Sequence, residues 1–311
     1  MCIGINFLES KKIIITGGLG FLGYSLLKKF QSKNNILVID NLSSNVHKIE
    51  EIKNYKSCEL INLDITDNKI NKVIKSYNPD YIIHTAAQTS VINSINQPEK
   101  NNKINIDGTR NIIESVKELS DCFFMLISSG GAVYGTPNYL PVDENHILDP
   151  ISPYGISKME AEKITLEHLK DTKYKYSIIR PSNIYGAHQK EANVIPKFIS
   201  LMKKNKTVSI YGDGNSTRDY VFIDDIVEII NKICEKKTEG IFNVSSNEEV
   251  KIIEIFNKLK SELDYKKNPK YISKVDGEIM NIYLDNSKIL NLIRNFKFTN
   301  IGNGLKKTLS D

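Results

Sequence analysis

Short β-branched runs alternate with helical patterns through the first 180 residues. Lys12–Thr16 (KIIIT) is continuously β-branched after its first residue, which is typical of a strand buried on both faces. Phe21–Phe30 follows with large apolar side chains three and four positions apart, which predicts a helix. Repeated strand–helix units predict an α/β fold of Rossmann type, a doubly wound parallel sheet covered on both faces. Further strands are predicted at 36–39, 59–63, 81–84, 122–127 and 176–179, and further helices at 67–77, 101–119 and 154–169.

After Arg180 this rhythm breaks, and proline and glycine interrupt shorter apolar segments. We therefore predict two domains: residues 1–180 form a cofactor-binding sheet, and residues 181–311 form mainly a smaller C-terminal α/β lobe for substrate. Segments of this lobe are expected to interleave with the sheet. Its short elements are predicted at 208–211, 224–235, 241–244 and 251–259.

Composition narrows the class of protein. The chain has 311 residues, 40% of them hydrophobic and 25% charged, which excludes global disorder. Its net charge of +5 comes mostly from scattered lysines, which is typical of a solvated surface and does not indicate a nucleic-acid partner.

The cysteines and the apolar runs suggest a compartment. Cys2, Cys58, Cys122 and Cys234 are too far apart for a CxxC pair, so we predict no metal site and a reducing, cytoplasmic location. No apolar run approaches the ~20 residues of a membrane span, and the N-terminus lacks the pattern of a signal peptide. No membrane association is expected.

The segment TGGLGFLG joins the first strand to the first helix and carries the spacing GxxGxxG. Gly17 permits a tight turn, Gly20 lets the backbone approach a pyrophosphate, and Gly23 allows close helix–strand packing. The N–H groups of Phe21 and Leu22 would face the phosphates at the start of the helix. The segment therefore predicts a dinucleotide site, the alternative being an ordinary glycine-rich turn.

Carboxylates follow the next two strands. Asp40 ends the second strand, where it can accept hydrogen bonds from a ribose 2′-hydroxyl and would repel a 2′-phosphate, which favours NAD over NADP. The alternative is that Asp40 and Asn41 only begin a turn. Asp64 and Ile65 follow the third strand, where the adenine is expected to lie.

Tyr154 and Lys158 form a YxxxK pair, which places both side chains on one face of a helix. An ammonium beside the phenol lowers its pKa from ~10 and suits it to proton transfer. The alternative is an ordinary surface pair. Ser128 and Ser129 follow the fifth strand, where a hydroxyl can reach a reacting oxygen or merely satisfy the backbone of a turn.

These motifs together resemble the extended short-chain dehydrogenase/reductase superfamily, in particular its nucleotide-sugar epimerase branch, which includes the UDP-glucose 4-epimerases. The resemblance runs from TGGLGFLG to LDNSK at Leu284. The intermediate matches are HTAAQ, SSGGAVYG, SPYGISK, RPSNIYG and YGDGNSTRDYVFIDD.

The resemblance implies an NAD-dependent enzyme that inverts C4 of a nucleotide-diphosphate sugar, such as UDP-glucose or its N-acetyl form, through a 4-keto intermediate. It implies that Tyr154 is the base, that Lys158 tunes Tyr154 and binds the cofactor ribose, and that the family's homodimer forms through helices 101–119 and 154–169. The other implied cofactor contacts are Ala86, Ala87 and Asn105, and the implied substrate contacts are Asn183, Arg218, Gln88 and Lys274.

The chain departs from the family pattern at three places. Gly130 stands where many relatives carry the catalytic Ser or Thr, so we expect Ser129, or failing that Ser128, to supply the hydroxyl. Val275 stands where relatives carry an arginine that contacts phosphate, and Lys274 would compensate for the loss of that arginine. Ile282 lies near the position where relatives set the room for a 2-N-acetyl group, and its intermediate size leaves open whether the sugar is glucose or N-acetylglucosamine.

The serine turn also distinguishes epimerases from other branches. Related dehydratases and decarboxylases place acidic residues there, whereas this chain has Gly131 and Ala132, which favours epimerisation over dehydration. The alternatives are a reductase, a dehydratase or an epimerase acting at another carbon. A non-catalytic dinucleotide-binding scaffold is disfavoured by the intact Tyr154–Lys158 pair.

Overall fold

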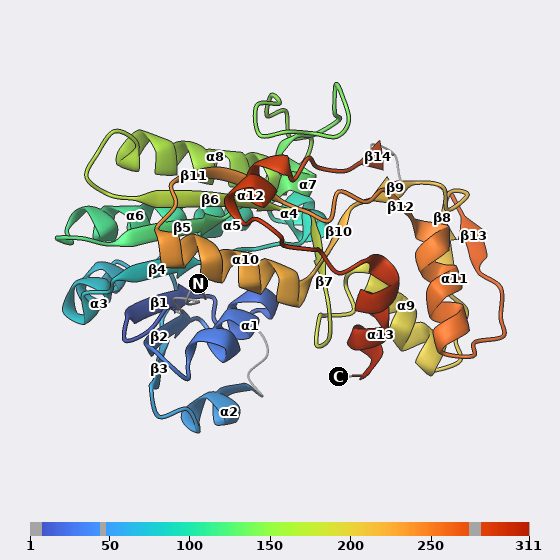
Figure 1. Ribbon diagram of the computed structural model, residues 1–311, viewed down its shortest axis with the longest axis horizontal. Helices are drawn as coiled ribbons and strands as arrows, with labels where there is room; N and C mark the ends of the chain where they lie inside the picture. Colours follow the sequence, from blue (N-terminus) through green and yellow to red (C-terminus); the bar gives the residue numbers. More distant parts are fainter. Residues whose placement is uncertain (1–7, 44–47, 274–280, 311) are drawn as a thin grey trace.

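A parallel sheet forms the centre of the computed structural model, which describes residues 8–43, 48–273 and 281–310 (Figure 1). Within these residues the sheet has seven strands in the order β11-β6-β5-β4-β1-β2-β3, and every neighbouring pair is parallel. The order reverses between β1 and β4, which opens a crevice at their carboxyl ends. The strands are β1 (Lys12–Thr16), β2 (Asn35–Asp40), β3 (Cys58–Asn62), β4 (Tyr81–His84), β5 (Phe123–Ile127), β6 (Tyr176–Pro181) and β11 (Gly240–Val244).

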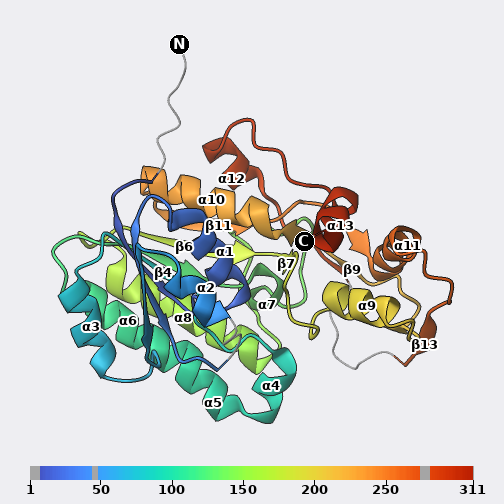
Figure 2. The ribbon, with the colours of Figure 1, turned by 90° about the horizontal axis from the view of Figure 1, so that it is seen from below.

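Helices cover both faces of the sheet, as Figure 2 shows. Ile13 and Ile15 of β1 pack into one core with helices α1 and α10, while Ile14 between them packs into a second core with α3, α6 and α8. This division explains why the strands are apolar at consecutive positions. The helices are α1 (Phe21–Phe30), α3 (Lys69–Tyr77), α6 (Gly108–Lys117), α8 (Pro153–Leu169) and α10 (Ile223–Lys236).

The helix predicted over 101–119 is interrupted, which corrects that prediction. The chain forms α5 (Pro98–Asn102), a π-helical turn η2 (Lys103–Asp107) and then α6. The Thr109 hydroxyl donates to the Asn105 carbonyl at 2.7 Å, and the Asn105 side chain bonds outside its own helix. These side-chain bonds compete with the regular helical pattern and accompany the wider turn.

A smaller lobe of short elements stands beside the sheet (Figure 1), in agreement with the predicted fold class. Both β11 and α10 return from this part of the sequence to the main sheet, so the two parts interleave. The lobe pairs β7 (Asn183–Tyr185) with β10 (Tyr220–Phe222), β8 (Ser209–Tyr211) with β13 (Lys270–Ile272), and β9 (Thr217–Arg218) with both β12 (Val250–Lys251) and β14 (Asn281–Ile282). The remaining helices are α2 (Ile49–Lys53), α4 (Val91–Asn96), α7 (Gly130–Val133), α9 (Val194–Lys203), α11 (Ile252–Glu262), α12 (Ser287–Leu292) and α13 (Ile301–Ser310).

His84, at the end of β4, lies directly below the crevice. Its Nδ1 is 2.7 Å from the Thr16 hydroxyl of β1, and its Nε2 is 3.0 Å from the Thr109 hydroxyl of α6. Burial, assisted by the positive charge of Lys158, lowers the pKa of His84 to about 3. His84 is therefore a neutral ring that joins the crevice floor to α6.

We expect this ring to make the protein acid-sensitive. The pKa in the folded state lies below the value of 6.5 for an unperturbed histidine, so stability is complete above pH 6.5 and falls as the pH drops towards 3. The loss from this group at pH 5 is about 2 kcal/mol. Urea unfolding of wild type and His84→Gln at pH 7 and pH 5 measures it: the variant should lose about 2 kcal/mol less than wild type. His168→Gln, which changes a half-exposed histidine, is the control, and equal losses in wild type and His84→Gln would refute the expectation.

Candidate functional site

The glycine turn between β1 and α1 is shaped by close backbone contacts. A Cβ atom at Gly17, whose φ is +68°, would lie 2.7 Å from Ala86 Cα, and one at Gly23 would lie 2.3 Å from the Gly17 carbonyl oxygen. The turn ends where α1 begins at Phe21, and the first turn of that helix carries no acidic side chain. Its first N–H groups lack intrahelical acceptors, so this cradle fits the pyrophosphate of a dinucleotide.

Asp40 supports this cradle from the neighbouring strand. Its carboxylate accepts the N–H of Leu19 at 3.0 Å and the N–H of Leu42 at 2.9 Å. The Asp40 side chain therefore stabilises the turn that begins at Asp40, which was the alternative interpretation of the sequence. A carboxylate has about four acceptor positions, so a ribose hydroxyl can still bind it.

The predicted adenine side is held by Asn41 and Asp64. Asn41 Nδ2 donates to Asp64 at 2.7 Å. Burial alone would raise the pKa of Asp64, but hydrogen bonds from Asn41 and Thr66 outweigh it and lower the pKa. Ile65 is buried, and a Cβ at Gly108 would lie 2.5 Å from its Cδ1, so Ile65 packs the floor of this region.

The HTAAQ turn forms the opposite wall of the crevice. Asn105 accepts the N–H of Gln88 at 2.8 Å and donates to the Gln88 carbonyl at 3.0 Å and to Ser157 Oγ at 2.9 Å. The Gln88 side chain donates to the Ser90 carbonyl at 3.0 Å. Both predicted contact residues thus brace the turn that carries Ala86 and Ala87, and Ser157 links this turn to the helix of the reactive pair.

The structure brings Tyr154, Lys158 and Ser129 together at the carboxyl end of β5. Helix α8 begins at Pro153, and Ser152 caps it by accepting the N–H of Gly155 at 3.1 Å. Tyr154 and Lys158 are buried on this helix, and Ser129 lies near enough to Tyr154 to lower the pKa of its phenol. Lys158 Nζ donates to the Ile127 carbonyl at 2.5 Å.

The pKa of Tyr154 is shifted in the direction opposite to our prediction. Burial raises it, and the hydrogen bond from Ser129 offsets only part of that rise. The prediction considered the lysine but not the loss of water, which disfavours a phenolate. Burial also lowers the pKa of Lys158 to about 8, with Glu162 opposing that shift.

The two candidate serines have different partners. Ser128 is buried and donates to the carboxylate of Glu162, whereas Ser129 reaches Tyr154. A Cβ at Gly130 would lie 2.4 Å from Leu284 Cδ1 and 3.2 Å from the Arg180 carbonyl oxygen. A side chain at Gly130 would therefore force Leu284 to move and would crowd the backbone of β6.

The predicted phosphate ligands lie on the smaller lobe. Asn183 begins β7, is exposed and donates its amide to the Asp219 carbonyl at 3.0 Å. Arg218 of β9 is half-buried and donates to the Thr217 carbonyl at 2.8 Å. Lys274 and Val275 lie outside the described residues.

Sequence reasoning missed Asp219 as a member of this lobe's framework. Its side chain is 1% exposed and accepts hydrogen bonds from Ser246 Oγ and from the N–H of Leu284, both at 3.1 Å. Burial raises its pKa to about 6 despite these bonds. The Asp219 carboxyl joins segments that are distant in sequence. The only feature of the sequence that could have identified it is its position beside Arg218 in the STRDY motif.

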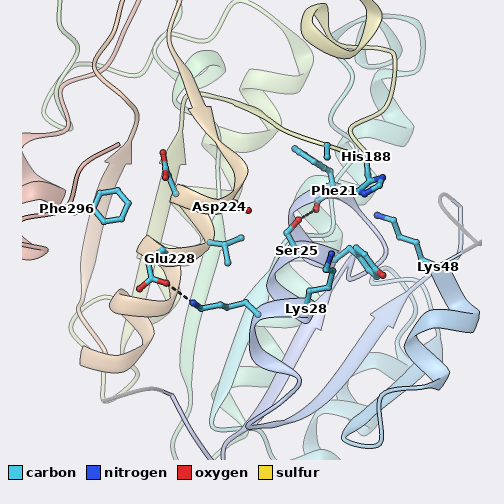
Figure 3. A pocket seen from close by; sticks show the side chains of 13 residues that line it. Phe21, Ser25, Lys28, Lys48, His188, Asp224, Glu228 and Phe296 are labelled. Atoms are coloured by element: carbon cyan, nitrogen blue, oxygen red, sulfur yellow. Dashed lines mark hydrogen bonds and ion pairs between the residues drawn. The ribbon is translucent and has the colours of Figure 1, made fainter. Parts of the chain in front are cut away.

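A separate cavity of about 500 Å³ lies between α1 and α10 (Figure 3). Phe21, Ser25 and Lys28 line it from α1, and Asp224 and Glu228 line it from α10. Tyr154 and Lys158 do not line it, so the reactive pair belongs to a different part of the surface. Within residues 8–43, 48–273 and 281–310, no cluster of three or more His, Cys, Asp or Glu side chains could hold a metal ion. No helix in these same ranges is long and apolar enough to cross a membrane.

A parallel sheet with a glycine cradle beside a buried tyrosine, a buried lysine and a half-buried serine defines an extended short-chain dehydrogenase/reductase. Residues 13–245 match the model of the NAD dependent epimerase/dehydratase family, and the chain belongs to that family.

Two relatives of this chain carry names that describe an activity. A Methanocaldococcus jannaschii protein, provisionally named a UDP-glucose 4-epimerase, is 38% identical over 281 residues, 89% of this chain and 90% of that protein. The dTDP-D-glucose 4,6-dehydratase of Dictyostelium discoideum is 33% identical over 80% of this chain and 61% of its own length.

Solved structures agree over almost the whole chain. The UDP-glucose 4-epimerase of Thermotoga maritima, solved with UDP-glucose, is 31% identical with a TM-score of 0.89, covering 96% of this chain and 97% of that one. The UDP-N-acetylglucosamine 4-epimerase of Methanobrevibacter ruminantium, solved with UDP-N-acetylmuramic acid, is 28% identical with a TM-score of 0.90, covering 97% and 98%.

Neighbouring glycines of the serine turn provide a matched test. Gly130→Ala should destabilise the protein by about 1–3 kcal/mol because its Cβ collides with Leu284 and with backbone. Gly131→Ala should be close to neutral, since a Cβ there meets nothing within 4 Å. Denaturant unfolding of both variants measures the difference, and equal stability of the two would show that the packing at Gly130 is looser than described.

Proposed function

We propose that this protein is an NAD-dependent epimerase that inverts C4 of a nucleotide-diphosphate sugar, UDP-glucose/UDP-galactose or the N-acetyl forms. The observation that carries this proposal is that the buried Tyr154 and Lys158 and the half-buried Ser129 lie together at the crevice of the parallel sheet. In the proposed division of labour, residues 1–180 bind mainly the cofactor and residues 181–311 mainly the substrate.

The residues of the cluster have distinct roles in this reaction. Bound NAD⁺ supplies a reversible hydride acceptor, so that C4 is oxidised to a ketone and reduced again without net use of cofactor. Tyr154 takes the proton of the 4-hydroxyl and returns it to the ketone oxygen, while Ser129 hydrogen-bonds the same oxygen. An ammonium has three donors, of which the Ile127 carbonyl uses one, so Lys158 can also bind the ribose and Tyr154.

The cofactor and the substrate would be held by the residues that the family resemblance implies. Backbone N–H groups of the glycine turn bind the pyrophosphate, Asp40 binds the ribose, and the region of Asp64 receives the adenine. Arg218 and Asn183 would bind the substrate diphosphate, because a guanidinium and an amide are suited to phosphate oxygens. Gln88 and Lys274 complete the proposed substrate contacts.

A dehydratase is the main alternative, since one relative carries that name. Expelling water from C5–C6 requires an acidic group near the serine turn, and this chain has Gly131 and Ala132 there. A Cβ at Gly131 meets nothing within 4 Å, so the structure has space for a side chain at that position. Epimerisation needs no further acid and therefore agrees better with the site.

The reaction is tested by incubating the purified protein with UDP-glucose and, separately, with UDP-N-acetylglucosamine. Formation of the 4-epimer with no net change in NADH is expected with at least one of them. A 4-keto-6-deoxy sugar as product would support the dehydratase, and no epimer of either sugar would overturn the proposal.

Tyr154→Phe keeps the ring and removes the proton carrier. Turnover in the same assay should fall by about 10²–10⁴-fold, while the NAD retained on purification, measured by mass spectrometry, should be largely unchanged. Tyr139→Phe is the matched control, since that phenol is 46% exposed. Near-normal turnover of Tyr154→Phe would remove Tyr154 from the role of base.

A cytoplasmic homodimer is part of the same proposal. Apolar side chains gather at the start of α8, against which α4 packs. This α4–α8 apolar patch consists of Val91, Ile92, Ile95, Ile151 and Ile156, all 44–71% exposed. The thiols of Cys58, Cys122 and Cys234 are free, as in proteins of reducing compartments. These features support a second copy covering the patch and the helices around 101–119 and 154–169.

A charge placed in the patch should separate such a dimer. Ile92→Lys removes the patch's most exposed apolar side chain, at 71%, and should shift the mass measured by light scattering from dimer to monomer. Tyr271→Lys, at a 52% exposed position on β13, is the control. A wild-type monomer, or a dimer that survives Ile92→Lys, would argue against this interface.

A further inference from the structure

Two oppositely charged side chains are buried directly behind the serine turn. Arg180 of β6 and Glu162 of α8 form an ion pair with 2.6 Å between Nη2 and Oε2, and Arg180 Nε lies 3.1 Å from both carboxylate oxygens. The side chains are only 4% and 2% exposed. Burying such a pair is costly unless its geometry and further hydrogen bonds compensate. An apolar pair of similar size would fill this space at less cost, so the two charges require an explanation beyond packing.

The ion pair joins several segments around the reactive cluster. Ser128, at the end of β5, donates to Glu162. Arg180 Nη1 donates to the Tyr134 hydroxyl at 2.9 Å, and that hydroxyl donates to Asn243 of β11 at 2.7 Å. Glu162 therefore holds both ends of the serine turn, directly through Ser128 and through Arg180 and Tyr134, against the helix that carries Tyr154.

The same carboxylate acts on Lys158, one helical turn earlier and on the same face of α8. Burial lowers the pKa of Lys158 to about 8, and the negative charge of Glu162 opposes that shift. The other groups near Lys158 supply no counter-charge: His84 of β4 has a pKa of about 3 and is neutral, burial raises the pKa of Tyr154 and so favours its neutral phenol, and the Ile127 carbonyl is a dipole. The guanidinium paired with Glu162 adds a positive charge.

We propose that Glu162 is a positioning residue of this active site: it holds the serine turn against α8 and keeps the ammonium of Lys158 charged beside Tyr154. The inference rests on the proposed function, because it assigns Glu162 to the service of the proton-transfer cluster. Glu162 makes no bond to substrate or cofactor in this role and acts only through Lys158 and the serine turn.

The charge on Lys158 can be measured without any substrate. Lysine side chains are labelled with ¹³C at Cε, the Lys158 resonance is identified by its loss in Lys158→Met, and the wild type is titrated by NMR. In Glu162→Gln the midpoint should fall by about one pH unit. Glu167→Gln, an exposed glutamate on the same helix, should leave the midpoint unchanged. An unchanged midpoint in Glu162→Gln would overturn the proposal.

Glu162→Gln leaves the Arg180 guanidinium buried without a counter-charge, which strongly destabilises a fold. The double variant Glu162→Gln/Arg180→Met removes both charges and keeps similar volumes. Its midpoint should also lie below that of wild type, because the carboxylate that opposes deprotonation of Lys158 is gone, but by less than in Glu162→Gln, because the guanidinium charge is gone as well. A wild-type midpoint in the folded double variant would equally overturn the proposal.

Catalysis gives the second measurement. In Glu162→Gln the alkaline limb of the pH profile of kcat/KM should move to lower pH by about one unit, whereas Glu167→Gln should keep the wild-type profile. A lowered NMR midpoint in a protein whose wild type does not epimerise either sugar would support the effect of Glu162 on Lys158 and overturn the proposed reaction instead. An alkaline limb that stays in place in Glu162→Gln would overturn the role assigned to Glu162.

Discussion

Parallel pairing across the sheet is the constraint on which the rest of this structure depends. Because every strand from β3 to β11 runs in the same direction, every carboxyl end lies at one edge. The glycine turn, Asp40, the HTAAQ turn and the serine turn each follow one of these ends, so residues more than a hundred positions apart meet there. The reversal of strand order between β1 and β4 then leaves the crevice in which a dinucleotide fits.

Burial sets the electrostatics at that edge. His84, Tyr154 and Lys158 are all removed from water, and burial pushes each of them towards its neutral form. The Glu162–Arg180 pair lies among these groups as the charged exception, stabilised by its two-point geometry and by Ser128 and Tyr134. In the proposed mechanism, proton transfer at neutral pH depends on how the Glu162 carboxylate opposes the effect of burial on the pKa of Lys158.

Steric exclusion restricts which side chains the serine turn can carry. Leu284 and the backbone of β6 fill the space that a side chain at Gly130 would need, and Gly131 beside it is unconstrained. Ser128 is engaged by Glu162, which agrees with the role proposed for Ser129 beside Tyr154. The contact with Leu284 also ties the serine turn to the C-terminal part of the chain, beside the strand that holds Ile282.

The sequence by itself determined where the strands of the main sheet lie along the chain, the glycine turn and the Tyr154–Lys158 pair, because these depend on spacing along the chain. Lys12–Thr16, Phe21–Phe30 and Tyr81–His84 have the bounds that their apolar patterns predicted. The roles of the predicted ligands remain predictions.

Only the tertiary structure decided the π-helical turn at Asn105, the hydrogen bond of Ser128 to Glu162, the upward pKa shift of Tyr154 and the pairing of Glu162 with Arg180. Each of these depends on which residues, distant in sequence, shield a group from water, bond to it or occupy the space beside it. Periodicity along the chain predicts that a residue is buried, but not what surrounds it, and the energy of a buried polar group is set by those surroundings.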